Sequence, residues 1–353
     1  MPSPTFNDVM FDVDAVEKGA WNPGPYGPGD QRGTFNEVTP EKTARALALL
    51  DTSRGVKTYQ LAEVMEAGFP AWGTRTYEQT LMVTGYQPPP GFEGTITDPL
   101  PQGPGHSSVN EERVALTYNM GTKINGLHHV GVAGTFYNGH VGPEMARTWG
   151  TTSLGTETMG PIVTRGVLVD VVGWAVANGL TDIYESSSSG HSLLLPNYRI
   201  TVEDIEGALA WEGIRTPIGP GDAVLLRTGW RELIGTDPDR YLRAGPPGPY
   251  LRECRYLAAR RPALVASDTW CFEIIDPVVT AGYAMPCHQE LSTRFGIRIG
   301  EAVRSDELAA DRAYEFVFCL SPTLARGAVA SNTPPLAIAQ GAVEKAAYEL
   351  APG

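Results

Sequence analysis

Positive charge is scarce in this sequence of 353 residues. Lys and Arg number 27 against 40 Asp and Glu, so the formal net charge is −13, and no run rich in Lys or Arg occurs. A nucleic-acid-binding protein needs a basic patch to meet the phosphate backbone, so this class of function lacks its electrostatic signature. An acidic surface also disfavours binding to anionic membranes.

Long hydrophobic runs are absent as well. No apolar stretch approaches the roughly 20 residues that a membrane-spanning helix requires. The first five residues, Met-Pro-Ser-Pro-Thr, contain no basic segment followed by an apolar core, so no signal peptide is expected. We therefore expect a cytoplasmic protein that binds neither membranes nor nucleic acids.

Cysteine is rare, and its spacing is not that of a zinc site. The four cysteines are Cys254, Cys271, Cys287 and Cys319, and free buried thiols in a reducing cytoplasm are the expected state. Cys287 precedes His288, but adjacent side chains usually diverge, which argues against a thiol nucleophile. A Gly-x-Ser-x-Gly elbow and a dinucleotide-binding fingerprint are also missing, so we expect no organic cofactor.

Glycine and proline, in contrast, are abundant, with 40 and 29 residues. They cluster in segments that also contain aromatic residues, which predicts ordered loops at 21–30, 87–92, 100–106 and 245–249. The chain is 42% hydrophobic and long enough to bury a large core. We expect one domain over residues 1–353, with an N-terminal Pro/Gly-rich arm over about residues 1–38.

Helix signals are few. Thr39 with Pro40 predicts the start of a helix whose Ala44, Leu47 and Leu50 form one stripe. Thr201 and Asp204 resemble a capping box, with Gly213 as the stop. Shorter helices are predicted over 305–309 and 341–350.

Strand signals are more numerous. Apolar runs with β-branched residues predict strands over 167–172, 223–228, 263–267 and 314–320. Strands with intervening helices favour an α/β domain with mixed β-sheets and peripheral helices.

The stretch from Asn119 to Val130, NMGTKINGLHHV, has the pattern of a metal-binding strand that lacks most of its ligands. The period of two of a strand places Asn119, Lys123 and Asn125 on one face, and His129 follows where the strand would end. A divalent metal prefers His, Asp or Glu at such positions. Because an ammonium repels a dication, this pattern argues against an ordinary metal site.

The same stretch resembles the signature of the cyclase family that includes kynurenine formamidase and isatin hydrolase. That signature runs His-x-Gly-Thr-His-x-Asp-x-Pro-x-His, and longer members read Thr-Gln-x-Asp-Gly-Leu-x-His followed by Phe-Tyr-Asn-Gly. This chain has TKINGLHH at 122–129 and FYNG at 136–139. The first two family histidines fall on Asn119 and Lys123, the aspartate falls on Asn125, and the last histidine is kept as His129.

The resemblance extends over most of the chain. Segments similar to family blocks lie at 29–40, 165–170, 219–230 and 267–270. His288, with Glu301 thirteen residues later, resembles the family's second catalytic element. The resemblance implies a swivelling β/β/α fold and favours a homodimer or larger homo-oligomer.

Four residues are candidates for catalysis. His129, His288 and Glu301 are expected to transfer protons, since a carboxylate near an imidazole can fix its tautomer and tune its pKa. Lys123 is expected to supply the positive charge that a metal would otherwise provide, unless it is a solvated lysine on an edge strand.

Five further residues are expected to bind the substrate, and they are Asn119, Asn125, Tyr137, Trp230 and Trp270. Core packing is the alternative for Tyr137 and for both tryptophans. His128 is expected to be structural, because it alternates in direction with His129.

Together these residues favour an enzyme that acts on a small organic substrate, and the resemblance points to a polyketide-like natural product. Our first hypothesis is metal-independent acid–base catalysis of ring closure or addition–dehydration. The alternative is a hydrolase of a cyclic amide, formamide or lactone, with Zn or Mn on His129, His288 and Glu301. A third hypothesis is a non-catalytic homologue that binds a small molecule.

Overall fold

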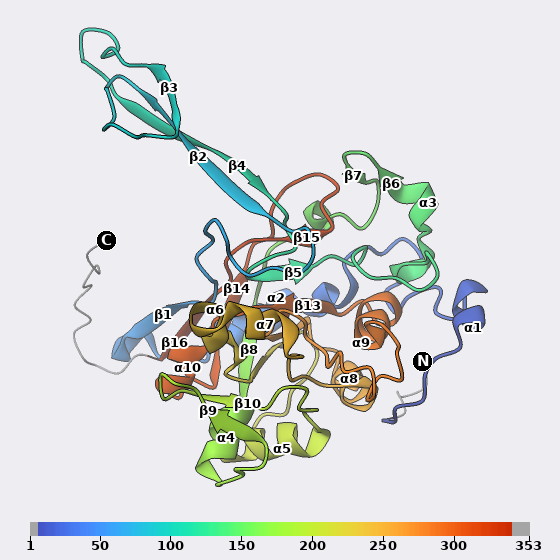
Figure 1. Ribbon diagram of the computed structural model, residues 1–353. Coiled ribbons are helices and arrows are strands. Elements are labelled where there is room, and N and C mark those ends of the chain that lie inside the picture. Colours follow the sequence, from blue (N-terminus) through green and yellow to red (C-terminus); the bar gives the residue numbers. More distant parts are fainter. Residues whose placement is uncertain (1–5, 341–353) are drawn as a thin grey trace.

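The computed structural model describes residues 6–340 of the chain. At its centre lies a nine-stranded sheet in the order β1-β16-β14-β8-β11-β12-β13-β5-β15 (Figure 1). Its strands are β1 (Val56–Gln60), β5 (Lys123–Asn125), β8 (Ile162–Asp170), β11 (Ala223–Arg227), β12 (Leu264–Ser267), β13 (Arg298–Glu301), β14 (Glu315–Leu320), β15 (Ala330–Ser331) and β16 (Leu336–Gln340).

The sheet is mixed, as the sequence predicts. β8, β11, β12 and β13 are parallel to one another at its centre. β14, β16 and β1 continue it on one side by antiparallel pairing, and β5 and β15 do so on the other. The four predicted strands fall on β8, β11, β12 and β14, but residues 171 and 172, predicted to end the first of them, are helical. The predicted α/β class with mixed sheets is confirmed.

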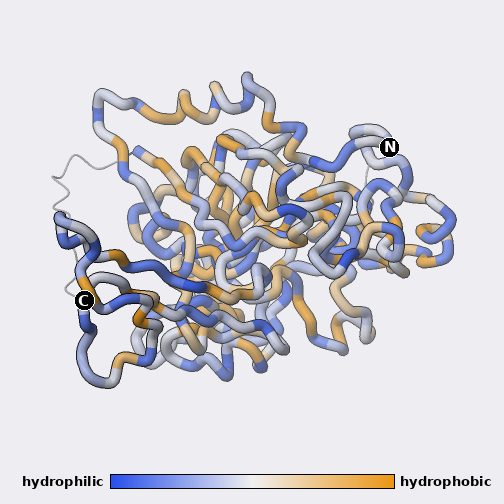
Figure 2. Tube along the Cα trace, turned by 90° about the horizontal axis from the view of Figure 1, so that it is seen from above, coloured by the Kyte–Doolittle hydropathy of each residue, from blue (hydrophilic) through white to orange (hydrophobic). Residues whose placement is uncertain are grey.

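Both faces of the central sheet are buried. Along β8, Val167 and Val169 belong to one hydrophobic cluster, and Leu168 between them belongs to another on the opposite face. Hydrophobic segments cross the middle of the body, and segments of both kinds reach its outline (Figure 2). Each fully buried Val or Leu contributes about 1.5–3 kcal/mol of burial free energy, which fixes the register of the strands that position the site.

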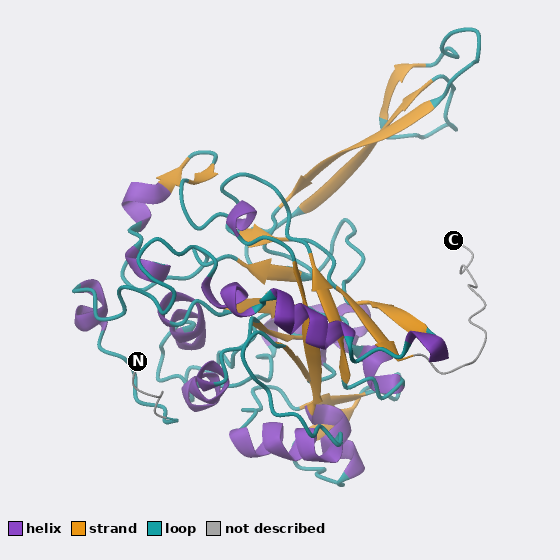
Figure 3. Ribbon diagram, turned by 180° about the vertical axis from the view of Figure 1, so that it is seen from behind, coloured by secondary structure: helices purple, strands orange, loops and turns teal. Residues whose placement is uncertain are grey.

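Short helices surround the sheet (Figure 3). The α-helices are α1 (Val13–Glu17), α2 (Pro40–Leu47), α3 (Gly142–Met145), α4 (Val171–Ala177), α5 (Val202–Trp211), α6 (Leu233–Thr236), α7 (Pro238–Arg243), α8 (Leu251–Ala259), α9 (Pro286–His288) and α10 (Asp306–Ala310). A π-helical segment, Gln289–Arg294, follows α9 directly, and single 3₁₀ turns lie at Gly33–Glu37, Thr52–Arg54, Tyr137–Gly139, Thr156–Thr158 and Trp230–Glu232.

Two predicted helix starts are confirmed, and one predicted stripe is wrong. The Thr39 side chain caps α2, and the capping box of Thr201 and Asp204 begins α5. Leu47, however, is 49% exposed, and Ala46 is the buried residue of α2. Ala44 is exposed as well, so the face that α2 buries is not the one that the apolar spacing predicts. The predicted helix over 305–309 is α10, and the one over 341–350 lies outside the described residues.

The N-terminal Pro/Gly-rich segment packs against the body. The Thr34 amide donates to the Gly296 carbonyl over 2.9 Å, and its hydroxyl donates to the Ala263 carbonyl over 2.9 Å. Phe35 is fully buried in the core cluster that contains Leu168. Between residues 6 and 38, the predicted arm is therefore tied to the sheet.

A three-stranded sheet projects from the body, and we call residues 77–116 the projecting arm (Figures 1 and 3). Its strands are β2 (Tyr77–Thr84), β3 (Thr95–Asp98) and β4 (Val109–Leu116), and only Val83 among their residues is buried. The sequence pattern predicts the loops at 87–92 and 100–106 but not these strands.

Two small hairpins are the remaining strand pairs among the described residues. They are β6 (Ala146–Arg147) with β7 (Gly150–Thr151), and β9 (Tyr184–Ser186) with β10 (Ser192–Leu194). Across residues 6–340, no helix combines the length and apolar character needed to cross a membrane.

Candidate active site

Lys123 and Glu301 face each other across two neighbouring strands. β5 pairs antiparallel with β13, and the register places Lys123 directly opposite Glu301. Such cross-strand residues lie side by side on one face of a sheet, so opposite charges meet without backbone adjustment. The intervening residue of β5, Ile124, points to the other face and is fully buried in the core. The strand period and the core position of Ile124 together aim Lys123 and Asn125 into the site.

The Lys123 ammonium is buried and paired. It forms an ion pair with the Glu301 carboxylate and donates a hydrogen bond of 2.9 Å to the Asn125 side-chain oxygen. The side chains of both charged residues are 3% exposed, and β15 covers the other edge of β5. The alternative of a solvated lysine on an edge strand is therefore wrong.

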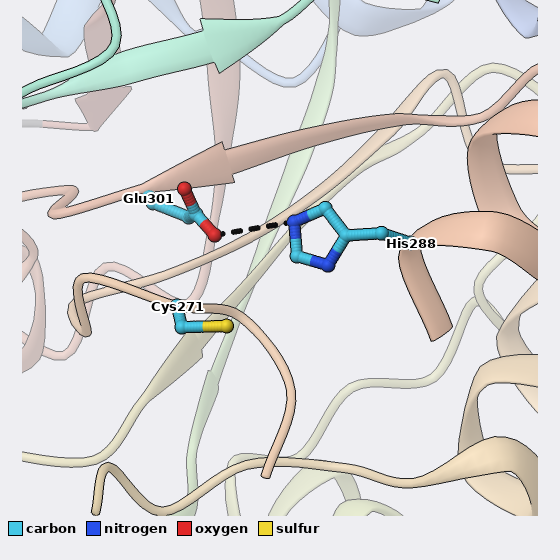
Figure 4. Close-up of side chains that lie close together, drawn as sticks. All are labelled: Cys271, His288 and Glu301. Carbon is cyan, nitrogen blue, oxygen red and sulfur yellow. Dashed lines mark ion pairs between the residues drawn. The ribbon is translucent and has the colours of Figure 1, made fainter. Parts of the chain in front are cut away.

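His288 lies between two carboxylates. Its Nδ1 is 2.6 Å from Glu273 Oε1, and its Nε2 is 3.3 Å from Glu301 Oε1, the contact drawn in Figure 4. His288 lies where α9 passes into the π-helical segment, an irregularity that is frequent at functional sites. The expected proximity of His288 and Glu301 is thus present in the structure.

Glu273 holds His288 in place and was not predicted from the sequence. Its carboxylate accepts backbone N–H bonds of 2.8 Å from both Cys287 and His288 as well as the imidazole contact. A carboxylate at the N-terminus of a helical segment is favoured by the free amides and the helix dipole. Glu273 belongs to the loop that leaves the carboxyl end of β12, and no spacing in the sequence connects it to residue 288.

The two carboxylates give His288 the character of an acid. Burial alone would lower the pKa of His288, but the hydrogen bonds to Glu273 and Glu301 raise it to about 9. Burial would likewise raise the pKa of Glu301, yet the Lys123 ammonium and His288 hold it well below its usual range. His288 is therefore an imidazolium at neutral pH and Glu301 is a carboxylate.

His129 has the opposite character. Its pKa is lowered well below 6.5, first by burial and then by the positive charges of Lys123 and His288. The Asn119 amide nitrogen lies 3.0 Å from His129 Nε2, and the His129 and His288 ring centroids are 6.5 Å apart. The site thus holds a neutral imidazole and a protonated one close to each other.

Both asparagines of the motif keep unused hydrogen-bonding atoms. Asn119 Oδ1 and Asn125 Nδ2 are buried without a partner among the described residues. An unsatisfied buried polar atom costs about 1–3 kcal/mol, so such atoms are rare in the absence of a role. They are free to bond a substrate.

The remaining predicted residues have different surroundings. Tyr137 is fully buried among Leu127, Met145 and Leu154, and its hydroxyl donates to Asp30 over 2.8 Å. Trp230 is also fully buried, and its indole N–H donates to the Tyr241 carbonyl over 3.1 Å. These are the surroundings of core residues, the alternative that the sequence left open.

Trp270 and His128 complete the set. Trp270 is half-buried and stacks on Trp72, with ring centroids 5.1 Å apart and an angle of 5° between the planes. His128 packs edge-on against Phe136 with a centroid distance of 4.2 Å, as expected for a structural residue.

The possible metal ligands that surround Lys123 do not form a donor set that fits a divalent metal. Cys271, His288 and Glu301 place one ligand atom each within 4.8 Å of one another, whereas the alternative metal set expected His129 in place of Cys271. Burial and the nearby Glu301 and Glu273 carboxylates raise the pKa of the Cys271 thiol well above its usual range, so it is a neutral thiol. Glu301 is already engaged by the Lys123 ammonium, which repels a dication.

Comparisons with known proteins bear on family and fold. A family model described as "Putative cyclase" matches residues 59–274. The crystal structure of a novel cyclase is similar with a TM-score of 0.73 and 26% sequence identity, over 93% of this chain and 99% of that chain. None of the curated proteins compared with this sequence matches it.

Two isatin hydrolases share the fold. Isatin hydrolase A from Ralstonia solanacearum has a TM-score of 0.56 and 17% identity, over 86% of this chain and 98% of that chain. Isatin hydrolase A from Labrenzia aggregata, bound to benzyl benzoate, has a TM-score of 0.54 and 16% identity, over 84% and 99%. At this identity the likeness concerns the fold alone. Because the family model spans more than half of the chain, and because the novel cyclase aligns over nearly all of it, the protein belongs to the cyclase family of enzymes.

Proposed function

We propose that this enzyme closes a ring, or adds and then eliminates water, in a small organic substrate by acid–base catalysis that needs no metal. The observation that carries the proposal is the buried Lys123 ammonium, paired with Glu301 at a position where the family resemblance places a metal ligand. A fixed positive charge inside a dry site can stabilise a developing oxyanion as a metal would. A polyketide-like compound is the substrate class that the resemblance favours.

Lys123 and Asn125 are the groups that stabilise negative charge. An ammonium has three N–H donors, and in the structure Glu301 and Asn125 engage two of them. The third N–H and the free Asn125 Nδ2 are then available to an enolate oxygen. The Asn125 amide suits this role better than the aspartate of the family motif, because a carboxylate would repel the enolate.

His129 and His288 have the opposed pKa values that a base and an acid need. In the forward step, neutral His129 removes a proton from carbon next to a carbonyl, and the enolate carbon attacks a second carbonyl carbon. His288 gives its proton to the resulting alkoxide. The contact of 3.3 Å between His288 and Glu301 is longer than an ordinary charge-assisted hydrogen bond, so it is the one that a substrate oxygen replaces.

Dehydration restores both histidines. Neutral His288 removes the second proton from the same carbon, and protonated His129 gives its proton to the departing hydroxyl group, which leaves as water. The sum of the two steps is substrate to cyclic product plus water, and each imidazole returns to its starting state. No oxidant, reductant or organic cofactor enters this balance.

Hydrolysis of a cyclic amide or lactone is the second candidate, and one observation favours it. Cys271, His288 and Glu301 could approach a single ion, because their ligand atoms lie within 4.8 Å of one another. The neutral Cys271 thiol and the Lys123 ammonium weigh against that use. The third candidate, a non-catalytic binding protein, has no account of why the two imidazoles are tuned in opposite directions.

Two probe compounds separate these reactions. Protein dialysed against a chelator is mixed either with heptane-2,6-dione, whose aldol closure and dehydration give a cyclohexenone, or with isatin. We expect ultraviolet absorbance of the enone to rise with wild-type protein in the presence of chelator, and His129→Ala and His288→Ala to abolish this rise. Hydrolysis of isatin that stops with chelator and returns with added zinc would instead support the hydrolase.

A further inference from the structure

Arg75 is a cation without a partner at the base of the projecting arm. Its side chain is half-buried, and it forms neither an ion pair nor a side-chain hydrogen bond with any residue in the range 6–340. Other partly buried arginines, in contrast, form ion pairs. Arg231, for example, pairs with Glu63 and Asp306. A partly desolvated guanidinium that lacks a carboxylate is unfavourable unless a ligand supplies one.

The base of the arm carries Arg75 to the site. The Thr117 amide donates to the Thr76 carbonyl over 2.9 Å, and the Thr76 amide donates to the Thr117 hydroxyl over 3.3 Å. These bonds continue the antiparallel register of β2 and β4, in which Tyr77 pairs with Leu116. Arg75 therefore lies across from residue 118, next to Asn119, whose amide contacts His129.

A stacked tryptophan pair fixes the chain on the other side of Arg75. Trp72, three residues earlier, lies flat on Trp270. Trp270 directly precedes Cys271, which is within 4.8 Å of the His288 and Glu301 ligand atoms. The indole N–H of Trp270 is buried and has no partner among the described residues. Arg75 is thus held between two segments that both lead into the site.

The positive charge of Arg75 is not balanced by the carboxylates of the site. Lys123 and protonated His288 are balanced by Glu301 and Glu273, with which they form ion pairs. Burial is the main cause that lowers the pKa of His129 and of Lys123, and the positive charge of Arg75 adds to it in both. The three cations Lys123, His288 and Arg75 and the two carboxylates therefore sum to one net positive charge.

We propose that Arg75 binds a carboxylate of the substrate, while the Trp72–Trp270 pair packs against its flat apolar part. The proposal rests on the proposed function and narrows its substrate to organic acids. A guanidinium matches a carboxylate with two parallel N–H bonds, which gives both affinity and orientation. The bound carboxylate would fix the reacting carbonyl relative to Lys123 and the two histidines.

Benzoate and benzamide form a matched probe pair of the same shape, one anionic and one neutral. Their dissociation constants are measured by calorimetry with wild type, Arg75→Gln, Arg75→Lys and Arg113→Gln. Wild type is expected to bind benzoate about tenfold or more tighter than benzamide. Arg75→Gln removes this preference, Arg75→Lys keeps part of it, and Arg113→Gln, an exposed position on β4, leaves it unchanged.

The proposal is overturned if benzoate binds no tighter than benzamide, or if Arg75→Gln keeps the wild-type preference. Because the readout is binding, His288→Ala protein serves as a second background in which turnover is lost and the benzoate preference should persist. Failure of the proposed function would give a different result: turnover would depend on a metal while the preference for benzoate stayed intact. Circular dichroism of each variant checks that the fold is retained.

Discussion

Two lysine–carboxylate pairs, one partly and one fully buried, lie at opposite ends of the parallel strands. Lys42 pairs with Asp222, which directly precedes β11, and Lys123 pairs with Glu301 at the carboxyl end of β13. Asp222 also accepts bonds of 2.9 Å from Arg165 and 2.8 Å from the Gly219 amide. Its network is complete, with none of these side-chain atoms left unbonded.

The pair at the carboxyl end has incomplete surroundings. Asn119 and Asn125 there keep buried unpaired atoms, and two imidazoles with opposite protonation lie with their ring centroids 6.5 Å apart. The same lysine–carboxylate pair thus has a different role in each place. A saturated network fixes the fold, whereas an unsaturated one retains the capacity to bind and to move protons.

The largest expected effect is on stability, at the saturated pair. Asp222→Asn leaves the partly buried Lys42 without a counter-charge and Arg165 with Glu315 alone, so the free energy of unfolding should fall by about 3 kcal/mol in urea titrations. Asp311→Asn breaks the exposed pair with Lys57 and should cost less than about 1 kcal/mol. Equal losses of unfolding free energy in the two variants would contradict a structural role for the Asp222 network.

The next effect is on turnover, at the unsaturated pair. Lys123→Met removes the charge that stabilises the oxyanion, and kcat should fall about 10²–10³-fold. Lys42→Met is the matched control, which should change kcat less than about threefold and affect mainly stability. If both substitutions reduced kcat alike, the distinction between the two pairs would not hold.

The third effect is the alkaline dependence of stability. His288 has a folded-state pKa raised from 6.5 to about 9, so its stabilising contribution is complete below pH 6.5 and is lost as pH rises through 9. The corresponding loss is about 3 kcal/mol, measured as the free energy of unfolding at a series of pH values against His288→Gln. A wild-type curve parallel to that of the variant would contradict the assignment.

The smallest effect is a shift of the activity profile. Glu273→Gln weakens the bond that raises the pKa of His288, so the alkaline limb of kcat should move from about 9 towards 6.5 by roughly one unit. Glu290→Gln removes a buried acid of the same π-helical segment that pairs with Arg255 and Arg294 instead. In that variant the limb should stay at about 9.

The sequence predicts the parts of the molecule in which local pattern and burial agree. β-Branched apolar runs identify the central strands, and the capping box at Thr201 identifies α5. The projecting arm was missed because its strands bury almost nothing, so no alternation of apolar and polar residues marks them.

The site was predictable only where its residues share one strand or one family motif. The period of two places Lys123 and Asn125 together, and the resemblance adds His129, His288 and Glu301. Glu273 and Cys271 reach the site from the loop after β12, and only tertiary packing decides those contacts. Lys123 is neutralised by Glu301 and Glu301 is shared with His288, which no linear spacing could have indicated.

Metal content tests most directly the claim that a lysine ammonium has taken the place of an ion. Wild-type protein and the triple variant Asn119→His, Lys123→His, Asn125→Asp, which rebuilds the family's donor set, are each equilibrated with zinc, dialysed and subjected to elemental analysis. We predict essentially no bound zinc in wild type and about one ion per chain in the variant. Stoichiometric zinc in wild type that survives dialysis, with Lys123 intact, would contradict the account.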